Sequence, residues 1–533
     1  MAGDPVYQRT PAVKCEDVAP PSEFLWVNER EEKREARAFF RKKQAFLKTQ
    51  HHRKRREEEM QRQKAPAMPA TADVALQKAR ITAGGQFPHQ HSQKRCSSPP
   101  VGPILHRPLD IGVLEAFPIH SIHLKQSVNV YLKHYDVYTS KCCFPFSSTD
   151  MTAWFWKQAL DQPATASILL SVGASHRAAN LWASGAPVQI VHELLQDAFQ
   201  LRSQTIELIQ KLLLNPAGVY KESNVLLIAH LLGIEAAEGN LEAARLHADG
   251  LKSIVDGMGG LDSLNHYTAT LVYCADLIAS CTRNSLPRFH ITPKWRQRVQ
   301  KESVIFNQQN HNSKSSPLGA RFLTSFWSRD LHPELKFTLQ LFRQFILCHH
   351  SPTGFGLTRN SGPQLSPLET DCLVFLDHLL LWLSADQSLK PYEQTLLLSL
   401  LLYSEIQIWT FLGMPCMKQR VQGIQNSLRR SLLTLQSTAP DLLFWVLFIT
   451  GLASRGLTQQ SWFLAHLTEI TEKLHIEDWD SAYAVLEEFF YVSGPTDDEA
   501  KYLWDLVLQR RGIRPPGSKH YFLKYSAIPT PDT

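Results

Sequence analysis

The sequence predicts an all-α protein, in which a body of many helices follows a basic, partly disordered N-terminal extension. Three observations lead to this prediction. Apolar residues recur at steps of three and four through most of the chain after Leu114, which is typical of amphipathic helices. Alternating runs typical of strands are almost absent. Basic residues gather in one segment, Glu31–Lys64, which holds thirteen Lys or Arg and six Asp or Glu.

Length and composition limit the class of protein. At 533 residues and 44% apolar, the chain can fold and is too long for one ordinary core, so two or more packed units are expected. The formal net charge is +6, but the basic segment alone carries +7, which leaves −1 for the rest. The body therefore has no excess of positive charge that would attract nucleic acid. Nine scattered cysteines favour free thiols in a reducing compartment.

Composition also divides the chain into segments. The stretch between the basic segment and the body is rich in Pro, Ser and Gln, which is typical of a linker. We expect a flexible tail over 1–30, a basic segment over 31–64, a linker over 65–113, a first helical half over 114–299, a polar loop over 300–317, a second helical half over 318–511 and a flexible tail over 512–533.

Three helices stand out in the first half. The first spans Ile190–Leu214, and Pro216 ends it because proline lacks the amide that a continuing helix needs. Its predicted buried face consists of Leu194, Ala198, Leu201, Thr205, Leu208 and Leu212. The second is the apolar run Val225–Ala237. The third begins after Asn240, a good N-cap, and ends at the glycines 257, 259 and 260.

The third helix carries the most specific expectations. Its predicted buried positions are Ala244, His247 or Ala248, Leu251, Ile254 or Val255, and Met258. Among these, His247 is interpreted as a hydrogen-bonded packing residue rather than a ligand. We expect Gly250 to lie where two helices approach closely, because a glycine has no Cβ to keep them apart.

The second half repeats the helical pattern. Its expected helices are Glu334–His349, Leu368–Leu383, Tyr392–Leu412, Val421–Ser437, Asp441–Ala453, Gln460–Leu474, Asp480–Tyr491 and Asp497–Gln509. The most apolar run, Thr395–Met414, contains Glu405 and Gln407, so we interpret it as a buried core helix rather than a membrane span. The opening MAGDPVYQRT has no apolar run, so we expect no secretory leader and no membrane partner.

No motif predicts catalysis, a cofactor or a metal. His192–Gln196 reads HELLQ, so the second imidazole of a zinc-protease helix is missing. The glycine-rich stretch after Asp256 follows no strand and fits a helix end better than a phosphate cradle. Cys142 and Cys143 are adjacent, and Cys274 and Cys281 lie seven apart, which is typical of small core residues rather than of a zinc site. We therefore expect no enzyme.

The basic segment has the form of a two-part nuclear import signal. A basic pair, Lys42 and Lys43, is followed after nine residues by a cluster of four, Arg53, Lys54, Arg55 and Arg56. A solvated charged helix ending in Glu57–Glu59 is the alternative. A leucine-zipper basic region does not fit, because Pro66 and Pro69 follow where apolar heptads are needed. Without a dimerising element the segment can contact phosphates but would distinguish few sequences.

One stretch carries a family resemblance. Residues 235–264 read EAAEGNLEAARLHADGLKSIVDGMGGLDSL. In this stretch one helix ends in Glu238, Gly239 and Asn240, and the next carries His247, Gly250 and Leu251 before Gly259, Gly260 and Leu261. This composite resembles the fungal-specific transcription factor domain, with these residues in structural roles. The stretch FLWVNEREEKREARAFFRKK from Phe24 is similar to the N-terminus of a fungal subgroup sometimes labelled tachykinin family proteins.

The resemblance covers about residues 24–60 and 115–510, and it departs from the family at one point. Family members that bind DNA usually do so through a binuclear zinc cluster of six closely spaced cysteines. Only Cys15 and Cys96 precede residue 140 here, so sequence-specific DNA binding does not carry over. The resemblance implies a nuclear, transcription-associated helical regulatory domain.

The leading hypothesis is a nuclear transcription-regulator-like protein without its own zinc cluster. Its helical body would act as a protein-interaction or effector-sensing module. Its partners would be a nuclear import receptor and other transcription regulators, with non-specific nucleic acid contact through the basic segment. The alternatives are a helical small-molecule-binding protein or enzyme, and a non-nuclear interaction scaffold. A pocket with convergent polar groups would favour the small-molecule alternative.

Overall fold

The structure, a computed structural model, describes residues 122–214, 216–303, 316–350, 366–494 and 496–513. These segments contain helices and connecting turns and no strand, so the predicted all-α class is confirmed for the described part of the chain. The predicted N-terminal tail, basic segment and linker lie outside the described residues. Most of the predicted polar loop and of the C-terminal tail also lies outside them. None of the described helices is long and apolar enough to cross a membrane.

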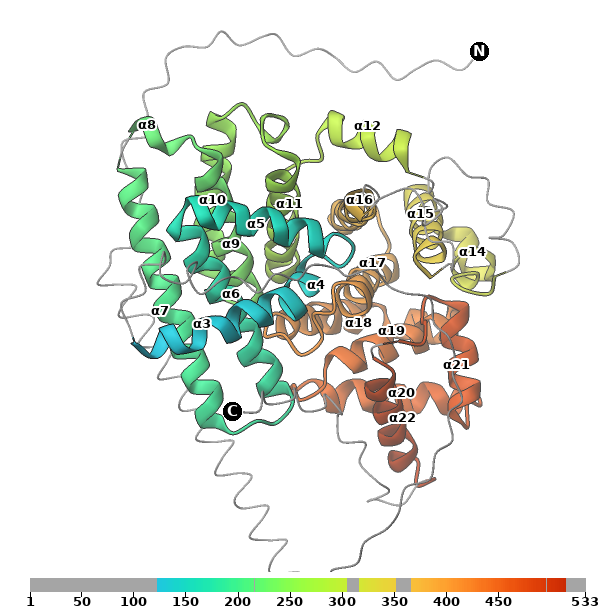
Figure 1. The fold of residues 1–533 in the computed structure, drawn as a ribbon. Helices are drawn as coiled ribbons and strands as arrows, with labels where there is room; N and C mark the ends of the chain where they lie inside the picture. The colour runs from blue at the N-terminus through green and yellow to red at the C-terminus, as the bar shows by residue number, and fades with distance from the viewer. Residues whose placement is uncertain (1–121, 215, 304–315, 351–365, 495, 514–533) are drawn as a thin grey trace, which may run out of the picture. The chain divides into compact units, whose positions relative to one another are not determined.

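The first half contains the helices that precede the polar loop (Figure 1). They are α3 (Ile122–His134), the π-helix η1 (Tyr135–Thr139), α4 (Ser140–Cys143), α5 (Ser148–Asp161), α6 (Pro163–Ala183), α7 (Val188–Leu213), α8 (Pro216–Val219), α9 (Glu222–Ala237), α10 (Leu241–Gly257), the 3₁₀-helix η2 (Leu261–Ser263), α11 (His266–Arg283) and α12 (Pro293–Glu302). Helix α12 extends past residue 299, so the polar loop begins later than predicted.

The second half contains the remaining described helices. They are α14 (Arg321–Thr324), the 3₁₀-helix η4 (Phe326–Asp330), α15 (Pro333–His350), α16 (Ser366–Ser384), α17 (Pro391–Tyr403), the π-helix η5 (Ser404–Ile408), α18 (Met417–Thr438), α19 (Pro440–Ala453), α20 (Gln460–Lys473), α21 (Trp479–Glu488) and α22 (Asp497–Arg510). The apolar run that was interpreted as core forms most of α17 and all of η5 and continues into the following turn, and most of its leucines are buried as expected.

Helices α6 and α7 form an antiparallel pair joined by a short turn, and α3 crosses α6. The crossing is close at Gly173, where an added Cβ would lie 2.7 Å from the carbonyl oxygen of Tyr131. The predicted buried face of α7 is correct in its middle, where Ala198 and Leu201 are buried, but wrong at its end. Leu212 is 38% exposed, because the last turns of α7 extend beyond the helices that cover its middle.

Two helices have no polar face, because other helices surround them. Helix α9 packs against α6, α7, α10 and α11, and nearly all its residues from Asn224 to Ala236 are buried. Helix α19 is buried from Leu442 to Ala453 and contacts α17, α18, α20, α21 and α22. A helix that is apolar all round is expected at the centre of a bundle. These two helices therefore mark the cores of the two halves.

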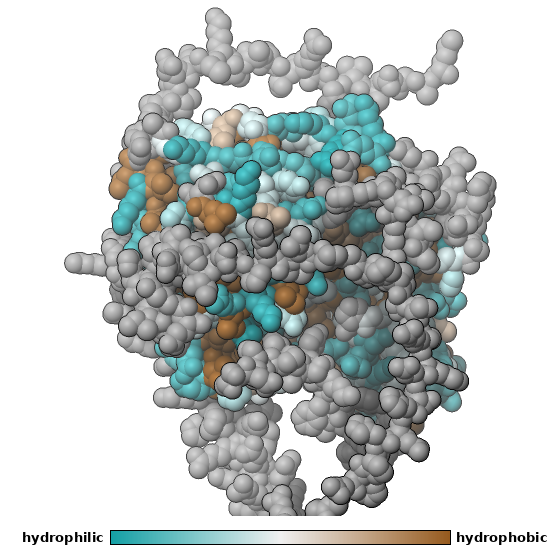
Figure 2. Space-filling view, viewed as in Figure 1, coloured by the Kyte–Doolittle hydropathy of each residue, from teal (hydrophilic) through white to brown (hydrophobic). Residues whose placement is uncertain are grey.

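Helix α11 connects the halves, because it packs against α9 and α10 on one side and against α16 and α18 on the other. A backbone hydrogen bond of 3.0 Å from Cys416 to Ala237 adds a second link. The surface is mixed: Figure 2 shows apolar side chains gathered near the end of α7 and α8, where Leu212, Leu214 and Tyr220 are exposed. The first half and the second half thus share one packed junction around α11.

Candidate functional site

The first part of the family-like motif is the turn that ends α9. Gly239 has φ +77°, which favours glycine. Its N–H donates to the carbonyl oxygen of Ala236 at 3.0 Å, and the N–H of Asn240 donates to that of Glu235 at 2.8 Å. These two bonds form the Schellman arrangement that satisfies the last carbonyls of a helix. An added Cβ on Gly239 would also lie 2.9 Å from Nε2 of Gln419 on α18.

The second glycine turn repeats this geometry at the end of α10. Gly259 has φ +94°, and its N–H donates to Asp256 at 3.0 Å. The N–H of Gly260 donates to Val255 at 2.9 Å, which completes the same pair of bonds. Leu261 follows and is buried at the start of η2. The prediction that these glycines end the helix is confirmed.

A buried ion-pair cluster, formed by Arg202, Glu235 and Glu238, holds the first turn in place. Arg202 on α7 donates from Nη1 to Oε1 of Glu235 at 2.8 Å and from Nη2 to Oε1 of Glu238 at 2.7 Å. Asn240 donates to the other oxygen of Glu235 at 2.8 Å, and Ser175 on α6 donates to Glu238 at 2.8 Å. The motif residues Glu238 and Asn240 thus tie α6, α7 and α9 to the start of α10.

Burial alone lowers the pKa of Arg202, but the attraction of Glu235 and Glu238 outweighs it and leaves the pKa above the ordinary value. The guanidinium therefore remains charged, as a buried cation between two carboxylates must. Sequence reasoning missed Arg202. The available signal was a charged residue beside Leu201, on the buried face of α7.

The helix α10 residues of the motif meet the expectations in part. Leu251 is fully buried, and so are Ala248, Ile254 and Val255. The expectation for Gly250 is wrong: an added Cβ there would meet nothing within 4 Å, so no helix approaches closely. His247 is largely enclosed, and burial lowers its pKa, but no described residue lies within hydrogen-bond distance of its Nδ1. His247 is thus enclosed as a packing residue, and at Nδ1 it lacks the kind of hydrogen bond that the sequence led us to expect.

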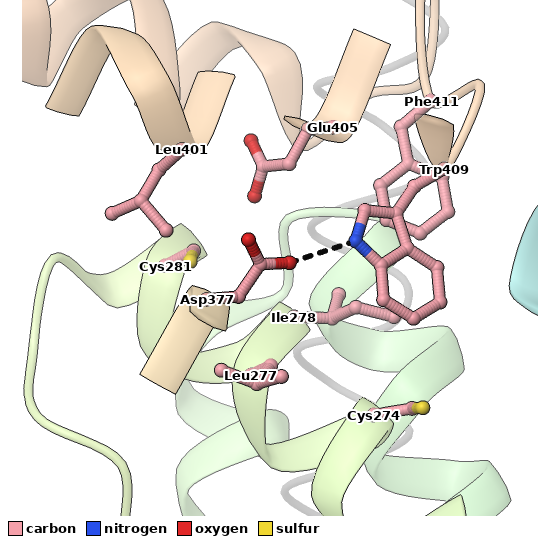
Figure 3. Close-up of a pocket in the computed structure, with 9 residues that line it drawn as sticks. All are labelled: Cys274, Leu277, Ile278, Cys281, Asp377, Leu401, Glu405, Trp409 and Phe411. Carbon is pink, nitrogen blue, oxygen red and sulfur yellow. Dashed lines mark hydrogen bonds between the residues drawn. The ribbon is translucent and has the colours of Figure 1, made fainter. Parts of the chain in front are cut away.

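A small cavity lies at the junction between the halves, where α11 meets α16 and η5 (Figure 3). Its volume of about 20 Å³ is enough for about one water molecule. Its lining residues are Cys274, Leu277, Ile278, Cys281, Asp377, Leu401, Glu405, Trp409 and Phe411. Small-molecule sites usually occupy about 300–1,000 Å³, so this cavity does not fit an organic effector.

Two carboxylates point into this cavity from different elements. Asp377 on α16 accepts hydrogen bonds at Oδ2 from Nε1 of Trp409 at 2.9 Å and from Oγ of Ser404 at 3.1 Å. Glu405 on η5 pairs through Oε1 with Nη2 of Arg420 on α18 at 2.6 Å. Figure 3 shows the two carboxylates facing each other across the cavity. Among the described atoms, Oδ1 of Asp377 and Oε2 of Glu405 have no hydrogen-bond partner.

Burial dominates the titration of this carboxylate pair. It raises the pKa of Asp377 to about 7, although hydrogen bonds from Trp409 and Ser404 act in the opposite direction. Burial also raises the pKa of Glu405, against the attraction of Arg420. Sequence reasoning noted Glu405 only as an argument against a membrane span, and it missed Asp377. The signal for both was a carboxylate inside an otherwise apolar helical run.

The other predicted site residues can now be placed. Cys274 is buried and Cys281 is half-buried on one face of α11, as expected for small core residues. Within the described segments no group of three or more His, Cys, Asp or Glu side chains is arranged to hold a metal ion. The six residues of the predicted import signal lie outside the described residues.

Comparison with known protein families finds a match that covers most of the first half. Residues 130–312 match the family described as the fungal specific transcription factor domain. No curated protein and no solved structure matches the chain. The matched segment includes the glycine turns and the Arg202 cluster. Residues 130–312 of this chain are therefore similar to the fungal specific transcription factor domain, over about a third of its length.

Proposed function

We propose that this chain is a nuclear transcription-regulator-like protein that acts through its helical body and lacks its own zinc-cluster DNA-binding module. The observation that carries the proposal is the match of residues 130–312 to the fungal-specific transcription factor domain. The spacing of cysteines supports the second part, because only Cys15 and Cys96 precede residue 140. A binuclear zinc cluster would need six thiolates close together.

The body is proposed to act by binding other transcription regulators. The cavity at the α11 junction is too small for an organic effector, so it gives no support to effector sensing. The mixed surface supports a protein-interaction role, since exposed apolar side chains at the end of α7 stand among polar ones. No residue of the chain is assigned a catalytic role in this proposal.

The basic segment is proposed to deliver the protein to the nucleus. Its two clusters of Lys and Arg fit an acidic groove on an import receptor, which binds such segments as extended chains. Lys42 and Lys43 would form the first contact, and Arg53–Arg56 the second. The rest of the chain sums to −1, so the segment is the main source of positive charge.

The test is the cellular distribution of the full tagged chain. Reversing the charges of Arg53, Lys54, Arg55 and Arg56 to Glu is expected to abolish nuclear accumulation. The matched control reverses four exposed cations scattered over the body, Lys157, Lys211, Arg430 and Lys501, which changes the net charge by the same amount. Unchanged nuclear accumulation in the first variant, or equal loss in both, would contradict the proposed delivery.

The regulatory role needs a separate readout. The full chain is fused to an unrelated DNA-binding domain with its own nuclear signal, and a reporter with that domain's binding site is measured. A change of the reporter that depends on the helical body is expected. A fusion that leaves the reporter at the level of the DNA-binding domain alone would contradict a regulatory role.

A further inference from the structure

The cavity at the α11 junction contains an imbalance of charge. Asp377 and Glu405 face it with two carboxylates, while Arg420 supplies one guanidinium, which pairs with Glu405 at 2.6 Å. Asp377 is 4% exposed, Glu405 is 5% exposed and Arg420 is 7% exposed, so water can compensate little of their charge. A buried carboxylate without a counter-charge is strongly unfavourable.

No other charged group among the described residues supplies the missing positive charge. Helix α11 contributes Cys274 and Cys281 to the cavity, and Cys416 lies before α18; burial raises the pKa of each of these thiols, so all three are neutral. On α16, His378 faces the backbone oxygens of Val374 and Phe289, to which a ring N–H can donate, and burial lowers its pKa to about 4, so it is neutral. The two carboxylates and Arg420 therefore leave one negative charge uncompensated.

Polar atoms without a partner on both carboxylates point to the same conclusion. Oδ1 of Asp377 and Oε2 of Glu405 have no hydrogen-bond partner, although both carboxylates line the cavity. Like charges on two close carboxylates cannot both persist in a dry site, and such pairs hold one proton between them. The cavity has room for one water that could bridge the pair. Nε of Arg420 is also buried without a partner, so the cluster has unused donors as well as unused acceptors.

We propose that Asp377 and Glu405 bind one proton in common in this cavity, and that release of the proton to solvent loosens the packing of α11 against α16 and η5. With the proton bound, the cluster of two carboxylates and one guanidinium is neutral. When the proton leaves, one buried negative charge stands without a partner between the two halves.

The position of Glu405 and Trp409 explains why loss of the proton would affect the packing around η5. Glu405 lies in the π-helix η5, where the wider turn leaves the regular α-helical hydrogen bonding of α17, and such turns recur at functional sites. Trp409, which donates to Asp377, follows η5 directly. A charge on the pair thus acts on the segment that connects α17 to α18. The same segment contacts α11 of the transcription factor domain through the cavity lining.

The first experiment measures the unfolding constant of the full chain as a function of pH. Because the shared proton is bound in the folded state and lost on unfolding, the constant of the wild-type chain relative to that of Asp377→Asn should rise about tenfold per pH unit between about pH 5 and 7. The ratio should then level off. Glu405→Gln should remove the same pH dependence, because the single remaining carboxylate, Asp377, is then balanced by the positive charge of Arg420. The exposed control Asp480→Asn should follow the wild type.

Three outcomes would overturn the shared proton. A ratio that does not change with pH excludes titration of the pair. A dependence that Glu405→Gln leaves intact assigns the proton to Asp377 alone. A wild-type stability at pH 7.5 that falls when potassium is replaced by tetramethylammonium at equal ionic strength, with no such effect in Asp377→Asn, assigns the positive charge to a bound metal cation.

Two direct readouts complete the test. Infrared spectroscopy at pH 6 should show a stronger carbonyl band of protonated carboxylic acids in the wild type than in Asp377→Asn, which keeps only the contribution of other buried carboxyls such as Asp371; a band of equal intensity in both overturns the proposal. Hydrogen exchange, corrected for the intrinsic effect of pH, should show protection of α11 and η5 falling above pH 7 in the wild type only. Equal protection in the two proteins overturns the loosening. Failure here would leave the proposed nuclear role untouched, since that role rests on other residues.

Discussion

Arg202 donates from Nη2 to the carboxylate of Glu238 at 2.7 Å, so a cation from the middle of α7 lies buried against the turn that ends α9. The second half of the same guanidinium contacts Glu235 one turn earlier. The glycine turn of the family motif is thereby held from two sides. Its conformation depends on Gly239, and its position depends on Arg202.

Replacing Arg202 by Met is expected to destabilise the chain by about 3–5 kcal/mol, because two buried carboxylates lose their cation while the packing volume is kept. The measurement is the free energy of unfolding from denaturant titration. Arg245→Met on α10 is the control: Arg245 also pairs with two carboxylates, but its side chain is 44% exposed, so a much smaller change is expected. Equal losses in the two variants would show that burial does not strengthen the Arg202 cluster.

Truncating Leu251 to Ala is expected to cost roughly 2–5 kcal/mol, as for other large-to-small core changes. Leu251 is fully buried on α10, where it faces the core with Ala248 and Val255. Denaturant titration again measures the loss. A loss below about 0.5 kcal/mol would mean that the side of α10 that faces the core is wrongly assigned.

Gly250 gives the opposite prediction one residue earlier. Since a Cβ at this position meets nothing within 4 Å and the residue lies inside α10, Gly250→Ala is expected to stabilise the chain by about 0.5–1 kcal/mol. Gly259→Ala is the matched control, because Gly259 also has open space but has φ +94°, which strains an L side chain. The control should be destabilised. A loss of stability in Gly250→Ala would indicate that another helix does approach Gly250 closely, as the sequence led us to expect.

Asp371 is expected to make the free energy of unfolding depend on pH, independently of the carboxylates in the α11 cavity. It is fully buried on α16, and burial raises its pKa to about 8, although Arg298 lies 3.4 Å away. A carboxyl with a raised pKa binds its proton more tightly in the folded state. The contribution of Asp371 to the free energy of unfolding should therefore be largest below the ordinary pKa of aspartate and decline as pH rises to about 8.

Asp371→Asn should remove the part of the decline that Asp371 contributes and leave the part that Asp377 and Glu405 contribute, which is measured by comparing thermal or denaturant unfolding of the two chains from pH 4 to 9. The exposed control Asp480→Asn should keep the whole decline. Parallel profiles for the wild type and Asp371→Asn would show that the Arg298 guanidinium keeps the carboxylate ionised throughout.

The sequence predicted the all-α class, several of the helices and the ends of the motif helices, because these depend on local chemistry. Asn240 precedes α10, although its side chain donates to Glu235 and does not cap the helix. The glycines at 259 and 260 end α10, as their preference for positive φ requires. The Arg202 cluster and the carboxylate pair could not be predicted, because their members come from distant parts of the sequence. Arg202 finds Glu235 and Glu238 on another helix, and Asp377 and Glu405 meet only because α16 packs on α17. A single sequence shows a carboxylate in an apolar run, but it does not show which cation or carboxylate will face it.

The basic segment Glu31–Lys64 is expected to bind DNA without preference for sequence. It has charge but neither a dimerising element nor a zinc-held scaffold that would fix a helix in the major groove. Phosphate attraction alone gives salt-dependent binding, with dissociation constants of about 0.1 mM to 1 µM at physiological salt. The assay is competition for the purified full chain between random and selected duplexes over a range of salt concentrations. Charge reversal at Arg53, Lys54, Arg55 and Arg56 should weaken binding equally for all duplexes and lower the salt dependence, whereas the four scattered body reversals should change binding much less. A preference of about a hundredfold for one sequence would exceed what phosphate contacts can supply and would show that another part of the chain contacts the bases.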